Sequence, residues 1–541
     1  MPTVQTLLPQ PLLANPYWLF QLKVFTLFQW GGIQLVSLWF LVLWLVIALL
    51  WLAQIQVRRA PALGALLFLA FVICVQLRFE PRPEVLSYVL LSLQLWLLLQ
   101  LRLERPELRI WLGLFLIQAL WTNCHSYFVL GPALGGVLVG STLWPSPSFT
   151  KFRMALATFA ILLIGSMVSP FGAANWRLAE AYAQVGRALR DVNAELMPPP
   201  LYPLYWPMPV FWVLWVMIAA MSVTVLLRRR STLPAILGLF GCALGVQALR
   251  NIPLTLILGA PLLAPMAIEL RLAKIFQRLV QLSVFMLALT LSVLVVHGDY
   301  HKWIYSLGTF GVHLESSAYP IGATEVLRHI QFHGRLFCDS YDGGYIEYQL
   351  PEVQVAGDSY FADPQVTLQY FAAIRNVEAL QHLDGQLHFD GLLINIENTG
   401  EVEALLADPH WQTAFADSHR ILFLRAANGQ PALPLNQARF YSGEDLTHWT
   451  YSFGVVTWSS LAFHRDDSAL MKKILQDTEA ASQVPAALLM NALMLALKTH
   501  DREMVDLAKA LKAKAFAESK READLLSSLF TQAESVTKPT S

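Results

Sequence analysis

Long apolar runs separated by short polar turns fill the first three hundred residues of the chain. A helix needs about 20 apolar residues to cross roughly 30 Å of hydrocarbon. Runs close to that length occur at residues 33–53, 62–77, 85–101, 127–143, 154–168, 210–227, 233–249, 252–268 and 279–296, with a shorter one at 110–121. The pattern therefore predicts a bundle of about ten transmembrane helices over residues 1–297.

After Gly298 the apolar runs become short and charged residues are frequent. Segments 335–338, 353–356, 391–396 and 420–424 have the pattern of strands, and segments 323–329, 366–379 and 402–407 have that of helices. This alternation predicts a small α/β domain over residues 298–435. Within it, the turn residues of 338–346 predict a turn in which Gly343 or Gly344 has a positive φ.

Residues 436–541 carry a helical pattern from Asp467 onward, in pieces such as 486–499 and 504–516. They predict a C-terminal helical region, and helix-hairpin repeats are one form it could take, although no repeated signature supports them. The predicted fold class is a polytopic α-helical membrane bundle followed by a small α/β periplasmic domain and this helical region.

Composition supports a membrane protein, since 55% of the 541 residues are hydrophobic and only 14% are charged. The formal net charge is zero and no basic stripe is present, so nucleic acid is not an expected partner. The four cysteines are isolated from one another, and no metal site or disulfide framework is predicted from them. No cofactor can be named from the sequence.

The orientation follows from the basic residues of the short loops, which concentrate on the cytoplasmic side of bacterial membranes. They fall in alternate connections, at Arg58, Arg59, Arg102, Arg105, Arg109, Lys151, Arg153, Arg228, Arg229, Arg230, Arg271, Lys274 and Arg278. We therefore expect a multi-pass protein of the bacterial inner membrane, with its soluble C-terminal region in the periplasm. Leu178, Tyr182, Val185 and Leu189 in the long outer connection have helical spacing and predict an interfacial helix.

Polar residues recur in the outer turns of this topology. They are Arg78, Glu80, Arg82, Glu84, Trp121, Asn123, His125, Glu195, Arg250 and Asn251. Charged groups at membrane depth are costly and commonly mark a binding site or a mutual ion pair. The alternative is ordinary loop polarity, in which His125 hydrogen-bonds a backbone carbonyl and Arg250 anchors a helix end.

The motifs around these residues resemble those of a known group of proteins. They are Arg82-Pro83-Glu84, the stretch from Trp121 to Phe128 with Gly131, Ser169-Pro170-Phe171-Gly172, Glu195 ahead of Pro198-Pro199, Arg250-Asn251-Ile252-Pro253, and Phe337 to Tyr345 with Val355 to Asp358. In this order they resemble a group of largely uncharacterised bacterial inner-membrane proteins, which is similar to polytopic glycosyltransferases of the GT-C type.

The resemblance implies transfer of a sugar from a polyprenyl-phosphate donor to a periplasmic acceptor. Arg82 or Arg250 would then bind the donor phosphate. Glu84 or Glu195 would serve as the general base, and His125 and Asn123 would orient either substrate.

One departure from the family pattern gives a second hypothesis. Related proteins carry a His-Glu pair before the Trp-Leu that matches Trp18-Leu19, where this chain has Pro16 and Tyr17, and no Asp or Glu precedes Glu80. Either an upstream segment belongs to the chain or the protein has lost its catalytic loop. In the second case it is a non-catalytic membrane scaffold whose periplasmic and C-terminal regions dock a protein partner. A transporter fits less well, because the centres of the apolar runs contain no Asp or Glu.

Overall fold

The computed structural model divides the chain into two compact units, Pro11–Tyr300 and Leu314–Ser541, with a few short segments assigned across the boundary. The structure describes residues 15–144, 147–190, 194–199, 207–228, 232–269, 273–300, 311–312, 319–357, 364–396, 398–416, 419–426, 458–460, 462–463, 466–479, 484–516 and 520–536.

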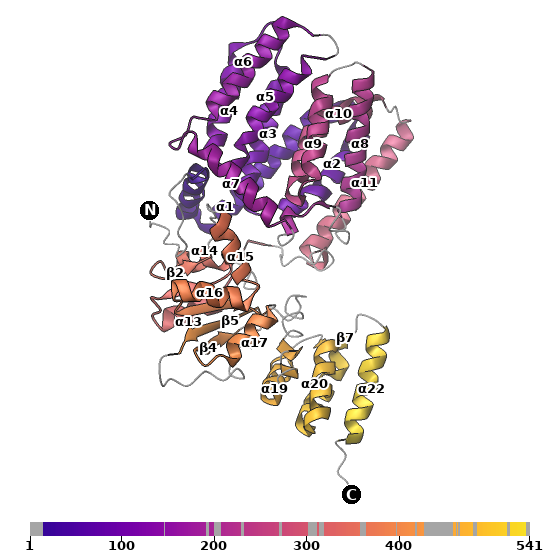
Figure 1. The fold of residues 1–541 in the computed structure, drawn as a ribbon. Helices are drawn as coiled ribbons and strands as arrows, with labels where there is room; N and C mark the ends of the chain where they lie inside the picture. The colour runs from indigo at the N-terminus through magenta and orange to yellow at the C-terminus, as the bar shows by residue number, and fades with distance from the viewer. Residues whose placement is uncertain are drawn as a thin grey trace. The chain divides into compact units, whose positions relative to one another are not determined.

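The first unit is a bundle of helices (Figure 1). Its helices are α1 (Trp18–Gln54), α2 (Pro61–Val75), α3 (Pro83–Gln100), α4 (Leu108–Thr122), α5 (Leu130–Ser141), α6 (Phe149–Gly165), α7 (Ala174–Ala188), α8 (Met208–Leu227), α9 (Thr232–Gly245), α10 (Ile252–Glu269) and α11 (Lys274–Val296). Each predicted apolar run falls on one of these helices. The helix predicted from Leu178 and its neighbours is also confirmed as α7, with Leu178 and Val185 buried.

Four of the described helices, α1, α3, α8 and α11, are long and apolar enough to cross a membrane. Apart from α10, the other apolar helices of the bundle are shorter than 18 residues, and α2 and α4 have 15 residues each. The lengths and composition of these helices are those of a multi-pass membrane protein.

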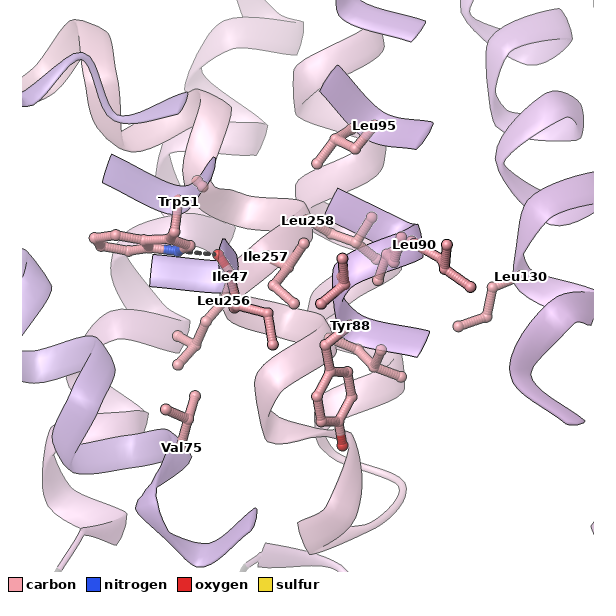
Figure 2. Packing of buried hydrophobic residues seen from close by; sticks show 14 of the residues in the cluster. Ile47, Trp51, Val75, Tyr88, Leu90, Leu95, Leu130, Leu256, Ile257 and Leu258 are labelled. Carbon is pink, nitrogen blue, oxygen red and sulfur yellow. Dashed lines mark hydrogen bonds between the residues drawn. The ribbon is translucent and has the colours of Figure 1, made fainter. Parts of the chain in front are cut away.

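Large apolar side chains from α1, α3 and α10 fill the centre of the bundle (Figure 2). The indole Nε1 of Trp51 donates a 3.0 Å hydrogen bond to the backbone oxygen of Leu256, so this buried polar group is paired. Glycines let α9 and α10 approach closely: a Cβ on Gly245 would lie 2.1 Å from Thr255 Oγ1. Small residues at helix contacts are typical of membrane bundles.

Helix α1 is interrupted at Gly31 and Gly32, whose backbone angles are not helical. Gly32 has φ of +59° with ψ of −157°, a conformation that glycine adopts without steric cost. Residues 18–30 and 33–54 are therefore two helical segments joined at a break.

The second unit contains a five-stranded mixed sheet in the order β2-β1-β3-β5-β4. The strands are β1 (Arg335–Phe337), β2 (Gln354–Ala356), β3 (Gly391–Asn395), β4 (Trp411–Ala416) and β5 (Arg420–Arg425), and β2, β1 and β3 are parallel while β5 and β4 are antiparallel to their neighbours. Helices α13 (Ile321–His329), α14 (Ser340–Gln349), α15 (Pro364–Ala373), α16 (Val377–Leu387) and α17 (Thr399–Ala407) connect and cover it. The predicted strands are confirmed, while β4 is an addition.

Two predictions about local structure in this domain are wrong. Residues 338–346 form no turn, because Asp339 caps the amino end of α14 by accepting a hydrogen bond from the backbone N–H of Tyr341. Segment 366–379 is not one helix, because α15 ends at Ala373 and Asn376 caps a new helix, α16.

Neither Gly343 nor Gly344 has a positive φ, and only one of them is needed for packing. A Cβ on Gly343 would lie 1.9 Å from the backbone oxygen of Gly357, which follows β2. A Cβ on Gly344 would meet open space. Gly343 therefore allows α14 to approach the end of β2.

This difference gives a paired prediction. Replacing Gly343 by Ala should lower the free energy of unfolding of the second unit by about 3 kcal/mol, because backbone must move to admit the methyl group. Replacing Gly344 by Ala should raise it by roughly 0.5–1 kcal/mol, because alanine is the better helix former. Thermal unfolding of the full-length protein, monitored by proteolysis of the second unit, measures both effects. Equal effects of the two variants would contradict the packing argument.

The described C-terminal residues are mostly helical, as predicted, and the predicted piece 486–499 is a single helix, but the piece 504–516 is helical only to Leu511 and ends in a short strand. They form α19 (Ser468–Asp477), α20 (Ala486–Thr499), α21 (Arg502–Leu511) and α22 (Lys520–Val536), with short strands β6 (Val484–Pro485) and β7 (Ala515–Phe516) paired in parallel. Asp467 and Asp501 cap α19 and α21. Helix α20 packs on both α21 and α22 through buried Ala and Leu residues.

Candidate functional site

The outer turns that the sequence singled out meet at one end of the helical bundle. They precede α3, follow α4, and join α9 to α10. The short helix Ala194–Leu196 adds a fourth segment, since the backbone N–H of Leu249 donates a 2.9 Å hydrogen bond to the oxygen of Met197. All six candidate residues, Glu84, Glu195, His125, Arg82, Asn123 and Arg250, belong to these turns or to the first turn of a helix.

Two arginines and three glutamates form an ion-pair network here. Arg78 pairs with Glu84 and also reaches Glu195, with 3.3 Å between Nη1 and Oε2. Arg82 pairs with Glu195 at 2.6 Å and with Glu80. The side chains of Arg78 and Glu84 are 5% and 9% exposed, whereas those of Arg82 and Glu195 are 28% and 26% exposed. The network thus has a buried half and an accessible half.

Glu84 belongs to the buried half. It lies in the first turn of α3, where a carboxylate also interacts favourably with the helix amino terminus. The hydroxyl of Tyr88 lies 3.4 Å from Glu84 Oε1 and 3.2 Å from the backbone oxygen of Arg250. Because Arg78 neutralises Glu84 away from solvent, these contacts favour a structural role for Glu84 over that of a general base.

Asn123 joins three parts of the bundle. Its Oδ1 accepts a 2.8 Å hydrogen bond from the indole of Trp18, and its Nδ2 donates to the backbone oxygens of Ala119 and Val168, each at 2.7 Å. Its own backbone oxygen accepts from the N–H of Leu19. Asn123 therefore positions the start of α1 and does not offer its amide to a substrate.

His125 is a buried, neutral imidazole between aromatic rings. Its ring centroid lies 5.4 Å from that of Tyr17 and 4.6 Å from that of Tyr127. Burial, together with the nearby guanidinium groups of Arg250 and Arg78, lowers the pKa of His125 from 6.5 to about 3. Because Nδ1 accepts a hydrogen bond from the backbone N–H of Tyr127, the ring proton is on Nε2, which is a donor.

Arg250 differs from the other arginines of the cluster. Its guanidinium carbon lies 5.9 Å from the centre of the Tyr127 ring, and Tyr127 itself donates to Asn251 Oδ1 at 3.1 Å. Among the residues that the structure describes, no carboxylate pairs with Arg250, and its buried Nε has no hydrogen-bond partner. A cation without a carboxylate partner among the described residues, on the other side of the Tyr127 ring from His125, is an arrangement suited to an anionic oxygen, such as that of a phosphate.

Three contributors were not singled out by sequence reasoning, or were given little weight there. Arg78 is one of the polar residues of the outer turns for which no role at the site is predicted, although it is the most buried cation of the network. Tyr17 packs against His125 and against Tyr182 of α7, with 6.0 Å between the ring centroids of Tyr17 and Tyr182. Tyr127 separates His125 from Arg250. Aromatic residues are common in this chain, so only their positions in space distinguish the two tyrosines.

Comparison with protein-family models and with curated protein sequences found no match to this chain.

Proposed function

We propose that the protein crosses the bacterial inner membrane about ten times and carries its second unit in the periplasm. The alternation of basic loops supports this orientation, and the coincidence of every predicted run with a helix supports the number of crossings. Helices shorter than 18 residues cross by thinning the bilayer locally or by extension into their turns.

We further propose that it is a GT-C-like glycosyltransferase, which moves a sugar from a polyprenyl-phosphate donor to a periplasmic acceptor. The observation that carries this proposal is Arg250, which pairs with no carboxylate among the described residues and lies over the ring of Tyr127, in one cluster with His125 and the accessible Glu195. The arrangement provides a phosphate site and a carboxylate within the same group of turns.

The residues then take distinct roles. Arg250 and His125 bind the donor phosphate through N–H groups, and Arg82 adds positive charge at the accessible side. Glu195 accepts the proton of the acceptor hydroxyl as the new bond to the sugar C1 forms. The bond between C1 and the phosphate oxygen breaks, and polyprenyl phosphate leaves with its charge held by Arg250. Glu84 keeps Arg78 in place.

Replacing Arg250 by Met tests the phosphate site. The loss of a charge-assisted contact to the donor should raise the KM for a polyprenyl-phosphate hexose by about 10–100-fold. The measurement is the release of polyprenyl phosphate by the purified protein in lipid vesicles. Arg177→Met, which removes an exposed arginine from α7, is the matched control and should leave KM unchanged. An unchanged KM in the Arg250 variant would remove the basis of the proposal.

One observation favours the scaffold as the second candidate. Tyr17 packs on His125 at the position where related proteins carry a His-Glu pair, and the cluster carboxylates Glu80, Glu84 and Glu195 are all engaged with arginines. In this case the ion pairs of the cluster only stabilise the helical bundle, and the second unit binds a protein partner. If the protein is a scaffold, replacing the residues that the enzyme proposal places in the site should have no effect in cells, as long as the variants fold.

A further inference from the structure

Gly186 lies in the last turn of α7, where neither the backbone nor the packing requires a glycine. Glycine destabilises a helix relative to alanine, and it is favoured only just beyond the helix end, where φ is positive. Gly186 does not have a positive φ. A Cβ added to it would have its nearest neighbours at 3.8 and 4.0 Å, which is ordinary van der Waals contact. An alanine would therefore fit at this position, and the absence of a side chain needs another explanation.

The nearest of these neighbours is the guanidinium group of Arg250. Its Nη2 lies 3.8 Å from the position of the missing Cβ, and Leu196 Cδ2 lies 4.0 Å from it. Gly186 and Arg250 are both partly exposed, while the Nε of Arg250 is buried without a hydrogen-bond partner. A side chain at position 186 would therefore lie against the guanidinium group and cover it on the side of α7.

Three other glycines of the bundle have different surroundings. Gly136 and Gly140 lie on the exposed face of α5, and a Cβ on either of them would meet no atom within 4 Å. Gly131 is required by packing, because its Cβ would lie 1.7 Å from Gln118 Oε1. None of these three glycines borders a charged group. The space that Gly186 leaves is distinguished by the cation beside it.

This space suits an oxygen atom of a phosphate. An oxygen that accepts a hydrogen bond from Nη2 lies about 2.7–3.2 Å from it, so on this side it would overlap with a Cβ at position 186. Arg250 pairs with no carboxylate in the described ranges, and a phosphate would supply the missing negative charge. We infer that Gly186 keeps Arg250 open to the phosphate of a lipid and is a specificity-determining residue of the donor site. The identity of this ligand rests on the proposed function.

Replacing Gly186 by Asp tests the inference, because the new carboxylate would pair with Arg250 and take the place of the phosphate. The probe is farnesyl phosphate, and its binding to the full-length protein in phosphatidylcholine nanodiscs is measured by isothermal titration calorimetry. The wild type should bind the probe, and Gly186→Asp should bind it about 10-fold or more weakly. Ala188→Asp, which adds a carboxylate at an exposed position of the same turn, should bind it as the wild type does.

Gly186→Leu tests the steric part of the argument without adding a charge. The leucine should fill the space beside Arg250 and also weaken binding by about 10-fold or more. Gly136→Leu, on the exposed face of α5, is the matched control and should not change the affinity. The melting temperature of each variant in the same nanodiscs shows whether it is folded. If Gly186→Leu does not fold, Gly186→Asp still decides the question, because its carboxylate gains a partner in Arg250.

The results separate this inference from the proposed function. The inference is overturned if Gly186→Asp binds farnesyl phosphate as the wild type does, or if Ala188→Asp loses binding to the same extent. If Arg250→Met loses binding while Gly186→Asp keeps it, only the role of Gly186 is wrong. If the wild type does not bind the probe, both the inference and the proposed phosphate site are wrong. Binding that depends on Gly186 and Arg250 in a protein that transfers no sugar would support the inference and contradict the proposed reaction.

Discussion

Replacing Glu195 by Gln should lower the rate of the proposed sugar transfer by about 10²–10⁴-fold, the usual contribution of a general base. The amide keeps the shape of the side chain but cannot accept the proton of the acceptor hydroxyl. Glu195 is the strongest candidate because it is about a quarter exposed and bridges Arg78 and Arg82, whereas Glu84 is buried. The measurement is kcat for release of polyprenyl phosphate in lipid vesicles, with the amount of folded protein determined in parallel.

Two other glutamates provide the controls for this experiment. Glu180→Gln changes an exposed carboxylate on α7 and should keep the wild-type rate. Glu84→Gln should reduce the amount of folded protein, because it weakens the buried pair with Arg78, and the rate per folded molecule should fall less than in Glu195→Gln. Full activity of the Glu195 variant would show that this carboxylate is not the base and would favour the scaffold.

Replacing Arg78 by Leu should lower the free energy of unfolding of the helical bundle by about 3–5 kcal/mol. Removal of one partner of a buried ion pair leaves the other charge without compensation, and Glu84 is that partner. Thermal unfolding of the detergent-solubilised protein measures the loss. Arg82→Leu removes a partly exposed cation of the same network, and its effect should be about 1 kcal/mol or less.

A double variant separates the charge effect from the loss of packing. Arg78→Leu combined with Glu84→Leu removes both buried charges, and apolar replacement of such a pair is often neutral or stabilising. We therefore expect the double variant to recover most of the stability lost in Arg78→Leu. If the double variant is as unstable as the single one, then the guanidinium contributes mainly through packing or through Glu195.

The sequence predicted the helices of the bundle well, because apolar runs of membrane length have few alternative structures. It was less successful where short segments depend on distant partners. Strand β4, Trp411–Ala416, was missed because its two alanines and its position after a helix weaken the strand pattern, and pairing with β5 stabilises it. The residues 338–346 contain two glycines and two aspartates, which favour turns, yet the cap at Asp339 and the approach to Gly357 make them helical.

The candidate site was also predicted only in part, because its pairings depend on residues that are distant in the sequence. Orientation from the basic loops placed Glu84, Glu195, His125, Arg82, Asn123 and Arg250 in turns of one face, and these turns do meet. The sequence could not show which charges pair. Arg78, for which no role is predicted from the sequence, is the most buried cation of the network, and Arg250 pairs with no carboxylate in the part of the chain that the structure describes. Such differences depend on separations of a few ångströms between segments over a hundred residues apart.

The break in α1 determines how much of that helix can lie within the bilayer. At 1.5 Å per residue, 37 continuous helical residues would extend about 55 Å, far more than the roughly 30 Å of hydrocarbon. Residues 33–54 alone extend about 33 Å, which matches the membrane without tilt. Residues 18–30 are thereby free to take another direction, which lets Trp18 reach Asn123 at the end of the bundle. The two glycines thus separate a segment that contributes to the cluster of polar turns, residues 18–30, from a segment with the length of a membrane span, residues 33–54.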